Sequence, residues 1–133
     1  MAMKKGYKQL LEEANQRIET IPVQDALKLK GDQDTVFVDI RDPRELERDG
    51  MIPGAFHAPR GMLEFWVDPD SPYHKDLFAS GKRFVFYCAS GWRSALATDT
   101  VKQMGLDRVA HIEGGFNGWK QAGGEVAERA KKN

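Results

Sequence analysis

Short apolar runs typical of buried strands alternate along this chain with segments of helical periodicity. The clearest runs are residues 35–40 (TVFVDI), 83–87 (RFVFY) and 108–112 (RVAHI). Because helical segments separate them, successive strands need crossover connections, which make neighbouring strands parallel. The sequence therefore predicts an α/β fold with a small, mostly parallel central sheet of about five strands, flanked by helices on both faces. Ligands of such sheets bind beyond the carboxyl ends of the strands.

Helix boundaries are marked by capping residues and glycines. Residues 42–45 (Asp-Pro-Arg-Glu) combine an N-cap acid, a proline at the first helical position and a glutamate three residues after the cap, so a helix is predicted to begin there and to end at Gly50. Further helices are predicted over residues 23–30, 94–104 and 116–122 from their periodicity and flanking glycines.

The chain divides into three predicted regions: an N-terminal helical extension (1–20), one domain (21–124) and a charged C-terminal tail (125–133). The extension is predicted to be an amphipathic helix, because its apolar residues recur at helical spacing on one face. These residues are Tyr7, Leu10, Leu11, Ala14 and Ile18. We expect this face to pack on its own domain, with a second copy as the alternative, so the chain is a monomer or a homodimer through this helix.

Composition excludes several classes of protein. A length of 133 residues suits one domain with a sizeable core, and 20 Lys and Arg against 20 Asp and Glu give no overall attraction to nucleic acid or to a membrane surface. One cysteine excludes an internal disulfide and a cysteine-based zinc cluster. No apolar run could cross a bilayer, so a cytoplasmic location is expected. No metal or cofactor is expected, since the histidines lack ligand spacing and are interpreted as surface or core residues: His57, His74 and His111.

The single cysteine, Cys88, follows the predicted strand 83–87 directly. A lone cysteine is most often a small buried hydrophobe. Here a helix begins just after the next loop and directs its free amides at that loop, Gly91 allows the backbone to turn amides inward, and Arg93 adds a permanent cation. Together these features favour a thiolate nucleophile at Cys88.

The segment CASGWRS (88–94) resembles the CxxGxR[ST] active-site loop of the rhodanese-like (thiosulfate sulfurtransferase) domain family. Residues 38–45 resemble its VDxRxPxE segment, residues 52–55 its HIPGA turn, and residues 113–123 its EGGxxxWxxAG segment. The resemblance covers about residues 21–124, in the family's order. Met51 departs from the family, which has a histidine at that position.

This resemblance implies a sulfurtransferase in which Cys88 attacks a small anionic donor such as thiosulfate, holds its sulfur as a persulfide and passes it to an external thiol, cyanide or protein acceptor. It implies that the loop amides bind the persulfide, that Arg93 holds the donor or braces the loop, and that Ser94 hydrogen-bonds the thiolate or merely starts the helix. The loop positions are Ala89, Ser90, Gly91, Trp92, Arg93 and Ser94. Segment 82–108 has five basic and two acidic residues, as a site for an anionic donor should.

Three matters stay open from the sequence. Asp39 and Arg41 share a strand face, and a structural ion pair is favoured over tuning of the site. Trp92 points either to solvent or into packing. A cysteine-based phosphatase or arsenate-handling enzyme is the first alternative function, although only four residues separate Cys88 from Arg93, against five in protein tyrosine phosphatases. A non-catalytic binding module is the second.

Overall fold

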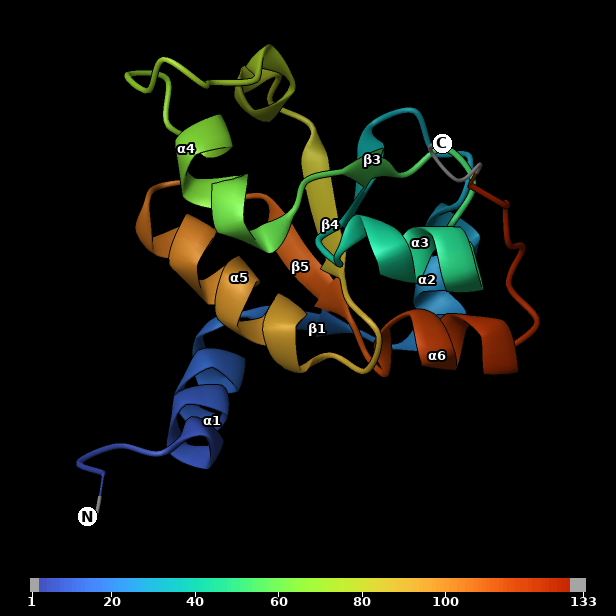
Figure 1. Ribbon diagram of the computed structural model, residues 1–133, viewed down its shortest axis with the longest axis horizontal. Coiled ribbons are helices and arrows are strands. Elements are labelled where there is room, and N and C mark those ends of the chain that lie inside the picture. Colours follow the sequence, from blue (N-terminus) through green and yellow to red (C-terminus); the bar gives the residue numbers. More distant parts are fainter. Residues whose placement is uncertain (1–2, 130–133) are drawn as a thin grey trace.

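A five-stranded sheet in the order β1-β5-β4-β2-β3 forms the centre of the protein in a computed structural model that describes residues 3–129 (Figure 1). Its strands are β1 (Glu19–Ile21), β2 (Thr35–Asp39), β3 (Phe56–His57), β4 (Arg83–Tyr87) and β5 (Val109–Ile112). Each pairing between neighbours is parallel. The predicted α/β fold with a small central sheet is confirmed, and the carboxyl ends of its strands lie at one edge.

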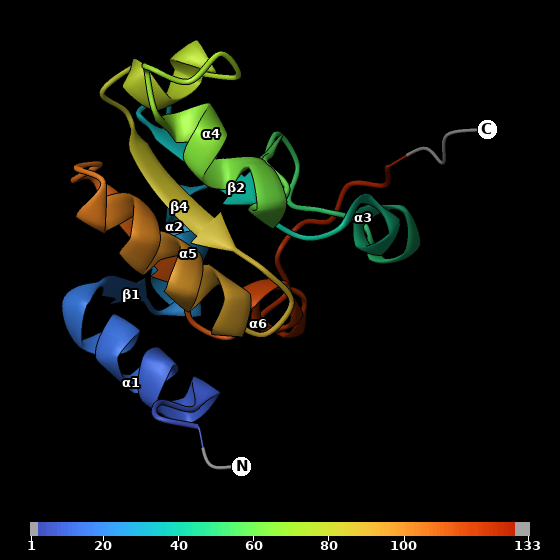
Figure 2. The same ribbon diagram turned by 60° about the vertical axis from the view of Figure 1, so that its left-hand side comes forward.

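Helices cover both faces of this sheet. The α-helices are α1 (Tyr7–Arg17), α2 (Val23–Leu29), α3 (Pro43–Asp49), α4 (Leu63–Val67), α5 (Trp92–Gln103) and α6 (Gly115–Gln121), with 3-10 turns at Arg60–Met62 and Asp76–Ala79. Helices α4 and α5 pack on one face, and α2 and α6 on the other (Figures 1 and 2). The inner strand β4 is apolar after Arg83 because both of its faces are buried there: Phe84 and Phe86 enter the first core, and Val85 and Tyr87 the second.

Helix α3 begins as its sequence predicts. The Asp42 side chain accepts a hydrogen bond from the Arg44 amide at 2.8 Å, and Glu45 completes the capping box. Gly50 ends the helix with a φ of +83°. This cap fixes the position of Glu45, which matters for the site described below.

The N-terminal helix α1 packs against α5 of its own domain, and the two helices lie side by side in Figure 2. Arg17 donates to both carboxylate oxygens of Asp99, at 2.8 and 2.6 Å. Ala14 is buried, whereas Tyr7 and Leu10 remain exposed. Strand β1 follows α1 closely. The sequence did not predict this strand, because only one of its three residues, Ile21, is buried and no apolar pattern marks it. The proposed division at residue 20 falls inside β1 and stays a prediction.

The first residues of the proposed C-terminal tail lie against the domain. The Glu125 carbonyl accepts a hydrogen bond from Trp119 Nε1 at 2.8 Å, and Ala127 forms an antiparallel bridge with Met51. Residues 130–133 fall outside the described residues. Between residues 3 and 129, no helix is long and apolar enough to cross a membrane.

Candidate functional site

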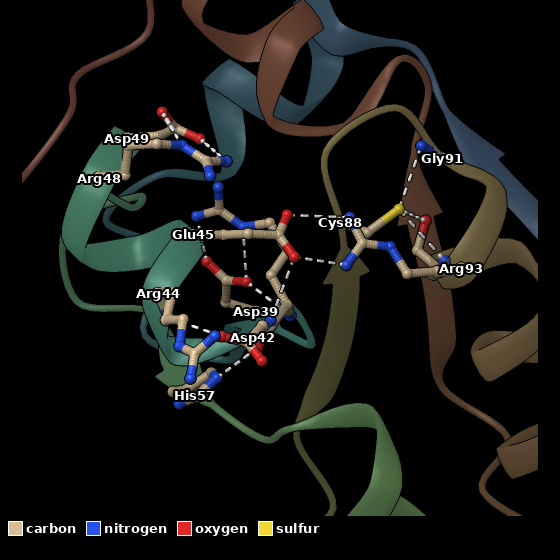
Figure 3. Close-up of polar contacts among 12 residues, drawn as sticks. Asp39, Asp42, Arg44, Glu45, Arg48, Asp49, His57, Cys88, Gly91 and Arg93 are labelled. Carbon is tan, nitrogen blue, oxygen red and sulfur yellow. Dashed lines mark hydrogen bonds and ion pairs between the residues drawn. The ribbon is translucent and has the colours of Figure 1, made fainter.

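Cys88 lies at the carboxyl end of β4, where the chain turns into α5. Its sulfur accepts hydrogen bonds from two backbone amides, Gly91 N at 3.2 Å and Ser94 N at 3.4 Å (Figure 3). The thiol is also 3.5 Å from the Ser94 hydroxyl, to which it donates. Cys88 is only 1% exposed. The arrangement suits a sulfur that carries negative charge, because amide donors and a helix N-terminus both favour an anion there.

The backbone conformation of Gly91 produces this convergence. Gly91 is the N-cap of α5 with a φ of +107°, in the left-handed region that glycine adopts without strain. Helix α5 therefore begins at Trp92, two residues earlier than the sequence predicts. Of the predicted loop residues, Ala89 is half-buried and Ser90, Trp92 and Arg93 are exposed. Trp92 packs beside Tyr7 of α1, with their ring centroids 5.2 Å apart, and keeps 58% of its surface exposed.

Backbone hydrogen bonds join the start of α6 to the cysteine loop. Phe116 N donates to the Cys88 carbonyl at 2.8 Å, and Asn117 N to the Ala89 carbonyl at 3.0 Å. Gly115 lies so close to this segment that a Cβ atom there would be 2.6 Å from the Cys88 carbonyl oxygen. The position therefore accepts only glycine without movement of the cysteine loop.

We expect Gly115→Ala to displace the Cys88 loop. Any residue with a side chain meets strain at a φ of +58°, and here the new methyl group also collides with backbone, so the free energy of unfolding should fall by about 3 kcal/mol. Gly123→Ala is the matched control, because Gly123 has a φ of +84° and no atom near its would-be Cβ. Urea titration of both variants measures the difference, and equal destabilisation would contradict the close contact.

Arg93 is engaged by a carboxylate rather than free. Its Nη1 and Nη2 donate to the two Glu45 oxygens at 2.7 and 3.0 Å (Figure 3). Hydrogen bonds from Arg93 hold the pKa of Glu45 below its usual range. This pair joins α3 to α5, so the Glu45 carboxylate offsets much of the positive charge that Arg93 places beside Cys88. Of the two roles left open for Arg93, the geometry favours bracing of the loop.

Asp39 and Arg41 form a buried ion pair, as favoured from the sequence. Arg41 Nε and Nη2 donate to the Asp39 carboxylate at 3.0 and 2.7 Å, and Nη2 also donates to the Gly50 carbonyl at 2.7 Å. The guanidinium lies over the Phe116 ring, 4.4 Å from its centroid. The pair therefore joins β2, the end of α3 and α6 beneath the site.

A hollow of about 270 Å³ lies beside Arg93, between the end of β2 and the turn that follows β3. Arg60 lines its other side, with its side chain 33% exposed and paired with Glu64. The sequence offered no signal for Arg60, because an isolated arginine after a proline is ordinary surface chemistry. Arg93, Arg60 and Arg41 all line this one depression, and the Arg41 side chain is buried in its pair with Asp39.

Ser94 links Cys88 to a buried histidine. The Ser94 hydroxyl is 2.9 Å from His111 Nδ1, and His111 Nε2 is 3.1 Å from the Thr20 hydroxyl. Ser94 and His111 are buried, whereas Thr20 is an exposed residue on the edge strand β1. Burial lowers the pKa of His111 to about 4, so the imidazole is neutral at neutral pH. The interpretation of His111 as a core histidine is correct but incomplete, since its contact with Ser94 depends on pairing between distant strands.

The buried His111 should make folding stability depend on pH. The unfolded chain takes up a proton at this ring near pH 6.5, but the folded protein does so only near pH 4, so stability falls as pH drops through that window. The loss from this group should reach about 3 kcal/mol. Urea unfolding across this range, compared with His111→Asn, measures the effect. The variant should lack this part of the pH dependence, and identical profiles would contradict a neutral buried ring.

Among residues 3–129, no group of three or more His, Cys, Asp or Glu side chains is placed to hold a metal ion.

Comparison with known proteins identifies the family. The sequence model of the rhodanese-like domain family matches residues 22–122, so this chain belongs to that family. A mouse protein, thiosulfate sulfurtransferase/rhodanese-like domain-containing protein 3, is 28% identical over 96 residues. That match covers 68% of this chain but only 61% of the mouse protein.

Solved structures also share this fold, among them the following two. A protein of unknown function from Rhodopseudomonas palustris, described as a possible tyrosine phosphatase, is 57% identical with a TM-score of 0.93, covering 96% of this chain and 98% of that one. The polysulfide-sulfur transferase homodimer from Wolinella succinogenes is 27% identical with a TM-score of 0.69, covering 93% of this chain and 88% of that one. The family resemblance expected from the sequence is confirmed.

Proposed function

We propose that this chain is a sulfurtransferase whose Cys88 carries a sulfane sulfur from a small anionic donor such as thiosulfate to a thiophilic acceptor. The observation that carries the proposal is the convergence of the Gly91 and Ser94 amides on the Cys88 sulfur at the N-terminus of α5. Membership of the rhodanese-like family supports it, as do relatives named as sulfurtransferases.

The proposed reaction has two steps. The Cys88 thiolate attacks the outer sulfur of thiosulfate, the sulfur–sulfur bond breaks, and sulfite leaves with the bonding electron pair. A nucleophile such as cyanide, a thiol or a protein acceptor then attacks the outer sulfur of the persulfide and regenerates the thiolate. Cys88 is the only cysteine, so the sulfur has to leave to an external acceptor.

The hollow beside Arg93 and Arg60 is the proposed approach for the donor. Both arginine side chains are partly exposed, and we propose that their N–H groups not used by the carboxylate partners Glu64 and Glu45 meet the donor anion. We propose that Ala89, Ser90 and Trp92 form the wall of this loop without direct roles in bond breaking.

Phosphatase activity is the second candidate, favoured by the description of the Rhodopseudomonas palustris structure. Against it stands Arg93, whose fork is already occupied by Glu45, because phosphate recognition uses the same bidentate fork. The loop is also one residue shorter than a phosphatase loop, which suits one sulfur atom better than a tetrahedral anion.

Parallel assays separate the two candidates. Thiocyanate formation from thiosulfate and cyanide should proceed with turnover, and hydrolysis of an aryl phosphate should remain near background. Aryl phosphate hydrolysis that depends on Cys88 and exceeds the rate of sulfur transfer would reverse the assignment. Binding of a protein partner that survives loss of Cys88, with neither activity present, would instead support a non-catalytic binding module.

A further inference from the structure

A continuous chain of hydrogen-bonding groups leads from the cysteine to the edge of the sheet. It runs from Cys88 through the Ser94 hydroxyl and both ring nitrogens of His111 to the Thr20 hydroxyl, with links of 3.5, 2.9 and 3.1 Å. Strand pairing places Thr20 directly opposite His111. Three elements, β1, α5 and β5, thus supply the groups beyond the sulfur, and β1 is distant from the other two in sequence.

The chemistry of these groups allows the chain to run in either direction. A hydroxyl both donates and accepts, so Ser94 and Thr20 can each serve an imidazole nitrogen whether or not it carries the proton. A neutral imidazole carries one proton and can hold it on either nitrogen. Because a hydroxyl lies at each side of His111, both of its tautomers are fully hydrogen-bonded.

We propose that Ser94, His111 and Thr20 form a reversible hydrogen-bond chain that follows the charge of Cys88, with His111 and Thr20 acting as positioning residues through Ser94. While Cys88 is a thiol, it donates to Ser94, Ser94 donates to Nδ1, and Nε2 donates to Thr20. When Cys88 is a thiolate, Thr20 donates to Nε2, Nδ1 donates to Ser94, and Ser94 donates to sulfur. The sulfur then has a third donor beside the Gly91 and Ser94 amides.

Protons and electrons balance in the change between the two states. The sulfur–hydrogen bond breaks and its electron pair stays on sulfur. One proton moves along each link, from sulfur to Ser94 Oγ, from Ser94 Oγ to Nδ1 and from Nε2 to Thr20 Oγ1, while the original Thr20 hydroxyl proton passes to bulk water. No group is oxidised or reduced. His111 is neutral before and after, which agrees with the lowering of its pKa to about 4 by burial.

Glu113 directly follows β5, and several other charged side chains around this end of the sheet are paired with one another. On the cysteine side they come from the end of β2, from α3 and from α5, and on the β1 side from α1 and α5. These pairs are Asp39 with Arg41, Glu45 with Arg93, and Arg17 with Asp99. Desolvation is the cause of the lowered His111 pKa, so the ring is free to respond to its hydroxyl neighbours.

The direct test is the tautomer of His111, read from its ring-nitrogen chemical shifts by NMR of histidine-labelled protein, with His111→Asn used to assign the signals. The Nε2–H tautomer should dominate while Cys88 is a thiol and the Nδ1–H tautomer once the ultraviolet absorbance of the thiolate appears. Their ratio should change by about tenfold or more, because hydrogen bonds to a charged group are the stronger ones. A ratio that stays constant as the thiolate forms would overturn the proposal.

Two nearly isosteric variants at Thr20 separate positioning from structure. Thr20→Asp offers Nε2 only an acceptor, which pins the Nε2–H tautomer, so alkylation of Cys88 by iodoacetamide at neutral pH should slow by about tenfold. Thr20→Asn both donates and accepts, and should keep the wild-type rate within about twofold. The assays run in high salt, which screens the added surface charge. Equal rates for the two variants would contradict the proposal.

The proposal rests on the proposed function in that the thiolate is taken as the nucleophile. Its tests nevertheless measure only the ionisation and alkylation of the Cys88 thiol and the tautomer of the His111 ring, not sulfur transfer. If the tautomer follows the thiolate but no sulfur is transferred, the chain is right and the proposed function is wrong. If sulfur is transferred while the tautomer stays constant, the reverse holds.

Discussion

Replacing Cys88 with serine is expected to reduce thiocyanate formation from thiosulfate and cyanide to the uncatalysed rate. The serine hydroxyl occupies the same place beneath the Gly91 and Ser94 amides, but it is not ionised near neutral pH and forms no persulfide. The chain has no second cysteine to take over. The loss should be on the order of a thousandfold or more, because the whole covalent route disappears. Colorimetric measurement of thiocyanate under saturating donor checks this.

The control for this variant has to separate chemistry from folding. Thr100→Ala, also on α5, should retain wild-type turnover, since Thr100 lies beyond the cysteine loop. Cys88→Ser should unfold at nearly the same urea concentration as wild type, because the change only replaces one sulfur atom with a smaller oxygen atom and leaves almost no cavity. Substantial turnover in Cys88→Ser would assign the chemistry to another group.

Replacing Arg41 with methionine is expected to lower the free energy of unfolding by about 3–5 kcal/mol. Asp39 is fully buried, and its carboxylate would lose a bidentate partner without gaining water. The Gly50 carbonyl would lose a donor as well. Because this pair connects β2, α3 and α6, the cysteine loop should lose order together with stability. Urea unfolding monitored by circular dichroism gives the magnitude.

Two further variants make this result interpretable. Arg108→Met breaks an ion pair with Asp34 in which both side chains are more than half exposed, and it should change stability far less. The double variant Asp39→Leu with Arg41→Met removes both buried charges and should recover much of the loss. If Arg41→Met were no more harmful than Arg108→Met, the buried pair would have no structural role.

Local signals in the sequence predicted most of the fold. Strands β2 and β4 were predictable because both faces are buried, which leaves continuous apolar runs. Helix α3 was predictable because its capping box and terminal glycine act within a few residues. Strand β1 was not, since a three-residue edge strand with one buried side chain carries no periodic pattern.

The position of Cys88 was predictable, but most of its surroundings were not. The cysteine, glycine and arginine of the loop lie within six residues, and the turn that they form is local. The Glu45 pairing of Arg93 spans 48 residues, and the chain from Ser94 to His111 and Thr20 depends on the strand order β1-β5-β4. Contacts of this kind require the register of paired strands, which one sequence does not specify.

The intact mass of the protein after incubation with thiosulfate tests the central claim most directly. Wild-type protein should gain the mass of one sulfur atom and lose it on addition of cyanide, as thiocyanate appears in equal amount. Cys88→Ser should show no gain. An unchanged wild-type mass after thiosulfate, or an equal gain in Cys88→Ser, would contradict the account of Cys88 as the sulfur carrier.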